Sequence, residues 1–360
     1  MKLRKALATA GVAVGAVAAT NELLSRRAEP LEPALEGEQR TYRWRGMDVA
    51  YTEAGDPDAP DLLFVHGVNA AASSQEWHEI FEPLSRAYHV VAVDLPGFGR
   101  SERPPLVYTA GLYEDFVADF AADVMDSPTI LASSLSGSYA ATAANRTAVD
   151  GLVLVCPTTS SMPGRRKRTV LAVLRSPLLG EAIFNAVSSN PSLEHFSADH
   201  GYYDVSSYTQ SKQSYQWQTT HQPGARFAPA SFVSGYLDPD VDLAATLSDL
   251  DVPVTLVWGR EADVTPLAEG RRLADATGAK LVVIDYSRLM PHDEHPDKFV
   301  EAIEDDLPEI SSEVFAEERR RSLERKRARE GRGDTGVQVE RERGGSESVE
   351  IDVEEPGNKD

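Results

Sequence analysis

Short apolar runs alternate with longer amphipathic segments along most of this chain of 360 residues. Runs of four to six apolar residues are typical of buried strands, and the segments between them have the spacing of helices. The predicted strands cover residues 41–44, 47–52, 61–65, 89–93, 129–132, 152–156, 253–258 and 281–285, and the predicted helices cover residues 74–86, 110–125, 135–147, 266–276 and 296–307. This alternation predicts an α/β fold, with a mostly parallel central sheet and helices on both faces.

The alternation stops between residues 157 and 243, which we interpret as an insertion into a core formed by residues 41–156 and 244–310. The insertion is rich in helix formers and in aromatic side chains: Phe196, Tyr202, Tyr203, Tyr208, Tyr215, Trp217, Phe227, Phe232 and Tyr236. An aromatic stripe of this kind is more often core than binding site. Residues 1–40 read as a hydrophobic segment with a linker, and residues 311–360 as a charged helix followed by a disordered tail.

The segment most suggestive of chemistry joins the predicted strand 129–132 to the predicted helix 135–147. Ser134 lies in the tight turn between them, with the small residues Ala132 and Ser136 two positions away on each side. Such a turn projects a serine hydroxyl free of the backbone at a helix N-terminus, where a neighbouring base can activate it. Small-residue turns also occur in many parallel sheets, so the pattern Ala-x-Ser-x-Ser alone does not identify a catalytic serine, and neighbouring motifs must be considered.

Two upstream segments supply that context. A buried strand ends in His66-Gly67, and a second strand runs into Asp94-Leu95-Pro96-Gly97-Phe98-Gly99. In order and spacing, over roughly residues 41–310, these segments and the serine turn resemble the α/β-hydrolase superfamily. The resemblance implies that Ser134 is the nucleophile, that the backbone N–H groups of Val68 and Leu135 form the oxyanion hole, and that the insertion is a helical cap over Ser134, some of whose rings line a substrate pocket.

The rest of the catalytic triad departs from the family pattern. The family acid motif Gly-x-x-Asp-x-x-x-Pro is matched by Gly259 and Pro266, but Ala262 holds the acid position and Asp263 comes one residue later. The family histidine motif matches from Pro291 onward and places Leu289 at the catalytic histidine.

Two interpretations therefore stay open. In the first, Asp263 and His292 form a shifted acid and base pair, and the chain is a serine hydrolase of small esters or related acyl compounds acting through Ser134. In the second, the relay is lost and the chain is a pseudo-hydrolase that binds without hydrolysing. Asp263 could equally cap the helix that begins near Pro266, and His292 could be a solvent-exposed or helix-capping residue. Ser134 argues against the dehalogenase and epoxide-hydrolase branches, which carry aspartate at this place.

Charge adds an expectation about the environment. The net charge is −21, and only eight of the 36 basic residues are lysine. An acidic, lysine-poor surface is typical of proteins that stay soluble in molar salt, where self-repulsion is screened. We expect a halophilic protein of a salt-rich cytoplasm such as that of haloarchaea; an ordinary acidic protein is the alternative. The same charge argues against nucleic-acid binding, so the expected partner is a small-molecule substrate.

Other chemistry finds little support in the sequence. Cys156 is the only cysteine, so no disulfide can form within one chain, and a buried thiol is expected. No Cys/His cluster has the spacing of metal ligands and no Gly-rich phosphate loop is present. We expect no metal and no cofactor.

The first 27 residues leave three interpretations open. Basic residues precede a small-residue apolar run over residues 6–19, which is followed by Arg26 and Arg27. The run is shorter than the roughly 20 residues of a membrane span. A secretion signal, a weak membrane anchor and a loosely packed cytosolic helix all fit, so membrane association and secretion stay open.

Overall fold

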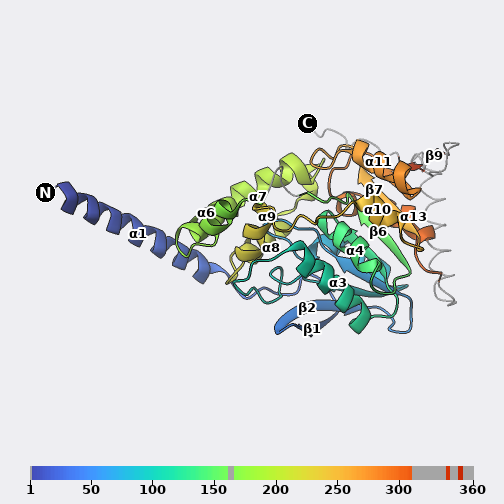
Figure 1. Ribbon diagram of the computed structural model, residues 1–360, viewed down its shortest axis with the longest axis horizontal. Coiled ribbons are helices and arrows are strands. Elements are labelled where there is room, and N and C mark those ends of the chain that lie inside the picture. Colours follow the sequence, from blue (N-terminus) through green and yellow to red (C-terminus); the bar gives the residue numbers. More distant parts are fainter. Residues whose placement is uncertain (1, 161–165, 310–337, 341–347, 352–360) are drawn as a thin grey trace.

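The computed structural model describes residues 2–160, 166–309, 338–340 and 348–351, and for residues 2–14, 338–340 and 348–351 the backbone alone. A sheet in the order β1-β2-β4-β3-β5-β6-β7-β8-β10-β9 forms the centre of the molecule (Figure 1). Its strands are β1 Glu38–Trp44, β2 Met47–Ala54, β3 Asp61–Val65, β4 His89–Val93, β5 Thr129–Ser133, β6 Gly151–Val155, β7 Val254–Gly259, β8 Lys280–Ile284, β9 Gln338–Glu340 and β10 Ser348–Ile351.

The strands from β4 to β8 run parallel, whereas β1, β2 and β4 pair antiparallel. All five residues of β4, β5 and β6 are buried, as expected for a parallel sheet covered on both faces. The predicted mostly parallel α/β fold is confirmed. Because parallel strands end at the same edge, the segments that follow β3, β5, β6, β7 and β8 converge there.

Two sets of helices cover the sheet. One set consists of α2 His78–Ser85, α12 Pro291–Glu294 and α13 Pro296–Ile303, which contact one another. The other consists of α3 Ala110–Val124, α4 Leu135–Ala144, α10 Leu243–Ser248 and α11 Leu267–Thr277, which contact one another in sequence. Short 3-10 helices, η1 Ser74–Trp77 and η4 Glu304–Asp306, extend the first set. The predicted helices 74–86, 110–125, 135–147, 266–276 and 296–307 are found, whereas the short helices α10 and α12 were not predicted.

The insertion between β6 and β7 carries helices and, in its described residues, no strand. These elements are α5 Arg168–Leu174, α6 Leu179–Val187, α7 Asn190–Phe196, the single turns η2 Ser197–Gly201 and η3 Val205–Ser207, α8 Gln210–Thr220 and α9 Phe227–Val233. Tyr202 donates a hydrogen bond of 2.5 Å to Asp293 of α12, and Lys212 pairs with the same carboxylate. The segment around Tyr202 is thereby anchored over the loop after β8.

At the N-terminus, α1 Lys2–Arg27 is a single helix that points away from the body (Figure 1). Its C-terminal half contacts α6, where the Asn21 amide donates to the carbonyl of Leu178 at 3.3 Å. No single helix in the described part of the chain is long and apolar enough to cross a membrane, whereas α5 and α6, bent by 90°, meet the length and composition test as a pair.

The C-terminal region differs in part from the sequence prediction. The charged helix expected at residues 313–330 lies outside the described residues, but two short strands are found in the expected disordered tail. β10 pairs parallel with β8, and β9 pairs antiparallel with β10. The physical reason is the edge of β8, whose backbone groups would otherwise lack partners in the sheet. The tail is too acidic for its hydropathy to predict that part of it pairs with the sheet.

Candidate active site

Ser134 occupies a strained turn between β5 and α4. Its backbone angles, φ 55° and ψ −128°, lie in a region that non-glycine residues rarely adopt. Backbone hydrogen bonds hold the turn from both sides: Ser134 N donates to Val155 O at 2.9 Å, and Thr158 N donates to Ser134 O at 3.2 Å. The side chain is partly exposed, so the turn presents a serine hydroxyl at the carboxyl edge of the sheet.

The small residues around Ser134 allow close packing. Ser136 Oγ donates to the carbonyl of His66 at 2.6 Å, which ties the helix after the turn to the His-Gly loop. A Cβ on Gly137 would lie 2.8 Å from Pro157 Cβ, so only glycine fits where α4 crosses the chain leaving β6. Close packing thus accounts for Gly137, and a hydrogen bond to the His-Gly loop accounts for Ser136.

The His-Gly loop lies directly against the serine. A Cβ on Gly67 would lie 3.1 Å from Ser133 Oγ and 3.4 Å from Ser134 Cβ. The next residue, Val68, is buried, and Leu135 is the first residue of α4. The first N–H groups of a helix have no partner within it. The two backbone donors expected from the sequence therefore lie on segments that flank Ser134.

A buried carboxylic acid behind this loop was not predicted. Glu76 Oε2 accepts from Gly67 N at 2.8 Å and also bonds the Ser133 side chain, while its side chain is only 7% exposed. Burial raises the pKa of Glu76 to about 7. Glu76 lies in the first turn of the helix predicted over residues 74–86, where an acidic residue is ordinary, so no signal in the sequence identifies it.

His292 lies in the same buried layer, facing Glu76. Its ring packs on Trp77 with centroids 4.5 Å apart, and Nε2 is 3.8 Å from Glu76 Oε1. Neither ring nitrogen has a hydrogen-bond partner among the described residues, and burial lowers the pKa of His292 to about 3. His292 is therefore a neutral, fully buried imidazole, and the expectation of a solvent-exposed histidine is wrong. Pro291 begins α12 one residue earlier, and this helical turn directs the side chain into the core.

The structure does not bring Asp263 and His292 together. Asp263 instead pairs with His200 of the insertion, with Oδ2 3.2 Å from Nδ1. Both side chains are partly exposed, 50% for Asp263 and 39% for His200. One residue further on, Gly201 O accepts from the backbone N–H of Leu289 at 3.2 Å. A histidine and aspartate pair thus lies beside the position at which the family motif would place its base.

The two positions at which the sequence departs from the family motif carry no ionisable group. Ala262 is buried with 6% of its surface exposed, and Leu289 packs against the hydrophobic core. The loops that carry them are nevertheless well tied, because Ser287 N donates to Glu261 Oε2 at 3.0 Å. The two loops are therefore held together by hydrogen bonding, although they lack the usual catalytic acid and base.

Other reactive groups have structural surroundings. Cys156 is buried, and burial raises the pKa of its thiol to about 12, so the thiol stays protonated. Among the described residues, no group of three or more His, Cys, Asp or Glu side chains is placed to hold a metal ion.

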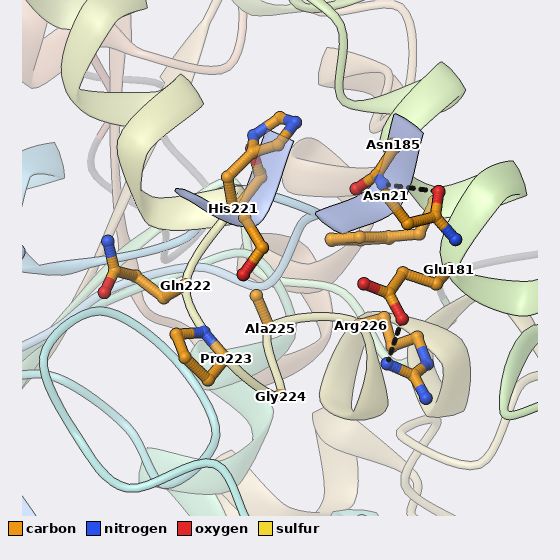
Figure 2. Close-up of a pocket in the computed structure, with 12 residues that line it drawn as sticks. Asn21, Glu181, Asn185, His221, Gln222, Pro223, Gly224, Ala225 and Arg226 are labelled. Atoms are coloured by element: carbon orange, nitrogen blue, oxygen red, sulfur yellow. Dashed lines mark hydrogen bonds and ion pairs between the residues drawn. The ribbon is translucent and has the colours of Figure 1, made fainter. Parts of the chain in front are cut away.

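A pocket lies away from Ser134, at the junction of α1 with the insertion (Figure 2). On one side of it the Asn185 amide of α6 donates to Asn21 Oδ1 of α1 at 3.1 Å, and Arg226 pairs with Glu181 at 3.5 Å. Its lining joins the N-terminal helix to the insertion, and it has no part in the geometry around Ser134.

The fold and the serine turn define a class of protein. Residues 62–302 match the family model described as the Alpha/beta hydrolase family. The match covers more than half of the chain, so the chain belongs to the alpha/beta hydrolase family.

Individual proteins show how far the likeness extends. The pimeloyl-(acyl-carrier protein) methyl ester esterase of Aeromonas hydrophila is 27% identical over 269 residues, 72% of this chain and 98% of the esterase. A haloalkane dehalogenase of Bradyrhizobium diazoefficiens is 43% identical over 63 residues, and the chain spans only 20% of that protein.

Solved structures give the same fold. The 2-hydroxy-6-oxo-6-phenylhexa-2,4-dienoate hydrolase of Rhodococcus superposes with a TM-score of 0.61 at 21% identity, over 75% of this chain and 98% of the hydrolase. A bacterial membrane phospholipase A superposes with a TM-score of 0.60 at 22% identity, over 84% of this chain and 94% of that chain. At these identities the likeness shows the fold alone.

Proposed function

We propose that this chain is a serine hydrolase of small esters or related acyl compounds, with Ser134 as the nucleophile. The observation that carries the proposal is the strained turn of Ser134 in contact with the His-Gly loop. Strain of this kind costs about 1–3 kcal/mol and is retained where a function uses it. The esterase relative, similar along nearly its whole length, supports ester chemistry.

The chemistry follows from the groups around the turn. Ser134 Oγ attacks the carbonyl carbon of the ester, and a base takes the hydroxyl proton. The backbone N–H groups of Val68 and Leu135 hold the oxyanion that forms. Removing one such donor from a hydrolase typically costs a factor of 10² to 10³ in kcat.

For the base we propose His200, oriented by Asp263. The carboxylate bonds Nδ1 of His200 at 3.2 Å, which leaves Nε2 free to accept a proton. His292, the base expected from the sequence, faces Glu76 inside the core, and a fully buried imidazole with a pKa of about 3 is poorly suited to take a proton. Catalytic hydrogen bonds often tighten only when substrate binds.

The remaining parts of the proposal concern the surroundings of the site. We propose that residues 157–243 act as a cap over Ser134 and that the partner is a small-molecule ester, with no nucleic acid and no cofactor. The acidic composition favours a cytoplasm of high salt. The N-terminal segment is proposed to associate weakly with a membrane.

Labelling with a fluorophosphonate in molar KCl tests the proposal. We expect wild-type protein to be labelled at Ser134, as located by mass spectrometry, and Ser134→Ala to be unlabelled. His200→Ala should slow labelling and the hydrolysis of a p-nitrophenyl ester by at least about 100-fold, the scale of general-base catalysis. His195→Ala, an exposed histidine of the same insertion, is the matched control and should leave both rates unchanged. If His200→Ala has no effect while His292→Ala abolishes labelling, His292 is the base.

The alternative is a pseudo-hydrolase that binds acyl compounds without cleaving them. The observation in its favour is that Ala262 and Leu289 hold the acid and histidine positions of the family motif. A folded wild type that neither takes the label nor turns over p-nitrophenyl esters of two to eight carbons would favour this function over hydrolysis.

A further inference from the structure

Basic residues are concentrated in two segments of this acidic chain. Residues 1–27 hold five basic and one acidic residue, and residues 157–187 also hold five basic and one acidic residue. The rest of the chain holds 26 basic and 55 acidic residues. Both segments are thus positively charged within a protein whose remaining surface is strongly negative.

These two segments meet in the fold. The base of α1 is fixed to α6 by the Asn21 amide, which donates to Leu178 O at 3.3 Å, and by the Asn185 amide, which donates to Asn21 Oδ1 at 3.1 Å (Figure 2). α5 contacts α6 in turn. The three helices α1, α5 and α6 therefore form one continuous surface, which we call the arm face.

Aliphatic side chains of the arm face are exposed. Leu179 is 58% exposed and Val187 57%, and Leu23 of α1 is 52% exposed. Their exposed neighbours on these helices and on the turn between α5 and α6 are Val17, Val173 and Leu178. Exposed aliphatic residues that cluster on connected helices mark an interaction site far more often than single ones do.

Cationic side chains belong to the same helices or lead into them. Arg26 and Arg27 end α1, and the exposed residues Arg166, Lys167 and Arg168 lead into α5. Helices with aliphatic residues beside Lys and Arg lie in the interface of a bilayer, with the apolar side chains among the acyl chains and the cations at the headgroups.

We propose that the arm face docks on a lipid bilayer with anionic headgroups. Charge complementarity and exposed aliphatic side chains together select this occupant, because the arm face is the positive part of an otherwise negative molecule and a bilayer offers anionic headgroups beside acyl chains. Arg side chains bind phosphate in two-point contacts, and charges in contact are screened less by salt than distant ones. The inference deepens the membrane association proposed for the N-terminal segment, but it does not depend on hydrolysis.

Flotation with vesicles tests this surface, at the lowest KCl concentration at which circular dichroism shows a folded chain. Vesicles contain phosphatidylcholine alone or with about 30% phosphatidylglycerol. We expect wild-type protein to float with the anionic vesicles and to bind the neutral ones at least about fivefold more weakly, since one basic residue near an anionic surface contributes about fivefold.

Variants separate the contribution of the basic side chains to vesicle binding from that of the aliphatic side chains. Lys167→Gln with Arg168→Gln should weaken flotation at least about fivefold, whereas Arg43→Gln with Arg86→Gln, exposed arginines outside the arm face, should not. Leu178→Ser with Leu179→Ser should weaken it at least about tenfold. Val264→Ser, an aliphatic residue 55% exposed outside the arm face, is the control for the aliphatic change.

Three results would overturn the proposal: no flotation of folded wild type, equal binding to neutral and anionic vesicles, or a dimer in solution that Leu178→Ser with Leu179→Ser dissociates while no vesicles are bound. Ser134→Ala should float like wild type, so loss of hydrolysis and loss of docking are distinguishable.

Discussion

Replacing the buried acid Glu76 by glutamine should stabilise the protein at neutral and higher pH. Burial raises the pKa of Glu76 from 4.5 to about 7, so the folded state holds a proton that the unfolded chain releases at lower pH. Glutamine has nearly the same shape, is neutral at every pH, and its oxygen can still accept the bond from Gly67 N. The change therefore removes the ionisation of a buried carboxyl and little else.

The sign and the size of the stability change with pH follow from the linkage between proton binding and folding. Because the pKa of Glu76 is raised in the folded state, wild-type protein loses stability as pH rises from about 4.5 to about 7. At 1.36 kcal/mol per pH unit this interval corresponds to about 3 kcal/mol. Glu294, whose pKa burial also raises, is present in both proteins, so its contribution cancels in the comparison. His292 stays neutral over this pH range in the folded state, because burial lowers its pKa to about 3.

The measurement is urea unfolding of both proteins at a fixed molar KCl concentration, between pH 4.5 and pH 8. The free energy of unfolding of Glu76→Gln minus that of wild type should rise by about 3 kcal/mol over this range. Glu82→Gln, an exposed glutamate on α2, should show no such rise. A difference that stays constant with pH would refute the reasoning, and would indicate that Glu76 is ionised and paired with a protonated His292.

Three further predictions concern the serine turn and the surface. Ser134→Gly should raise the free energy of unfolding by about 1 kcal/mol relative to Ser134→Ala in urea melts, because glycine relieves the positive φ of 55°; equal stability would contradict strain. Gly67→Ala, whose new Cβ meets Ser133 Oγ at 3.1 Å, should slow fluorophosphonate labelling at least about tenfold, since a shift of the oxyanion donors costs catalysis; an unchanged rate would show that the loop adapts. Folding should require molar salt, and full stability in about 0.1 M KCl by circular dichroism would rule out the halophilic interpretation.

Local patterns predicted much of this architecture because they depend on neighbours in sequence. The strand 129–132 reads as an uninterrupted apolar run because both faces of the sheet are covered. The turn at Ser134 is recognisable because small residues flank it, and at Gly137 the close approach of Pro157 leaves room for glycine alone. The expected α/β-hydrolase fold followed from these signals.

Pairings between distant segments could not be predicted in this way. Asp263 meets His200, which lies 63 residues away in an insertion of a different pattern. The burial of Glu76 and His292 depends on how η1 and α12 pack against each other. The hydrophobic pattern around His292 shows only a polar residue after a proline, so it does not predict that the side chain is buried. The pairing of β10 with β8 is equally remote in sequence.

The contact between Gly201 and Leu289 has a consequence for the order of events in the proposed reaction. His200 comes from the insertion, whereas Ser134 comes from the core, and the hydrogen bond from Leu289 N to Gly201 O is one of the links that hold the two together. If the proposed cap lifts to admit substrate, the proposed base His200 would move away from Ser134 with it. The serine would then stay unreactive until the cap closes over a bound ester, and closure would contribute to substrate selection.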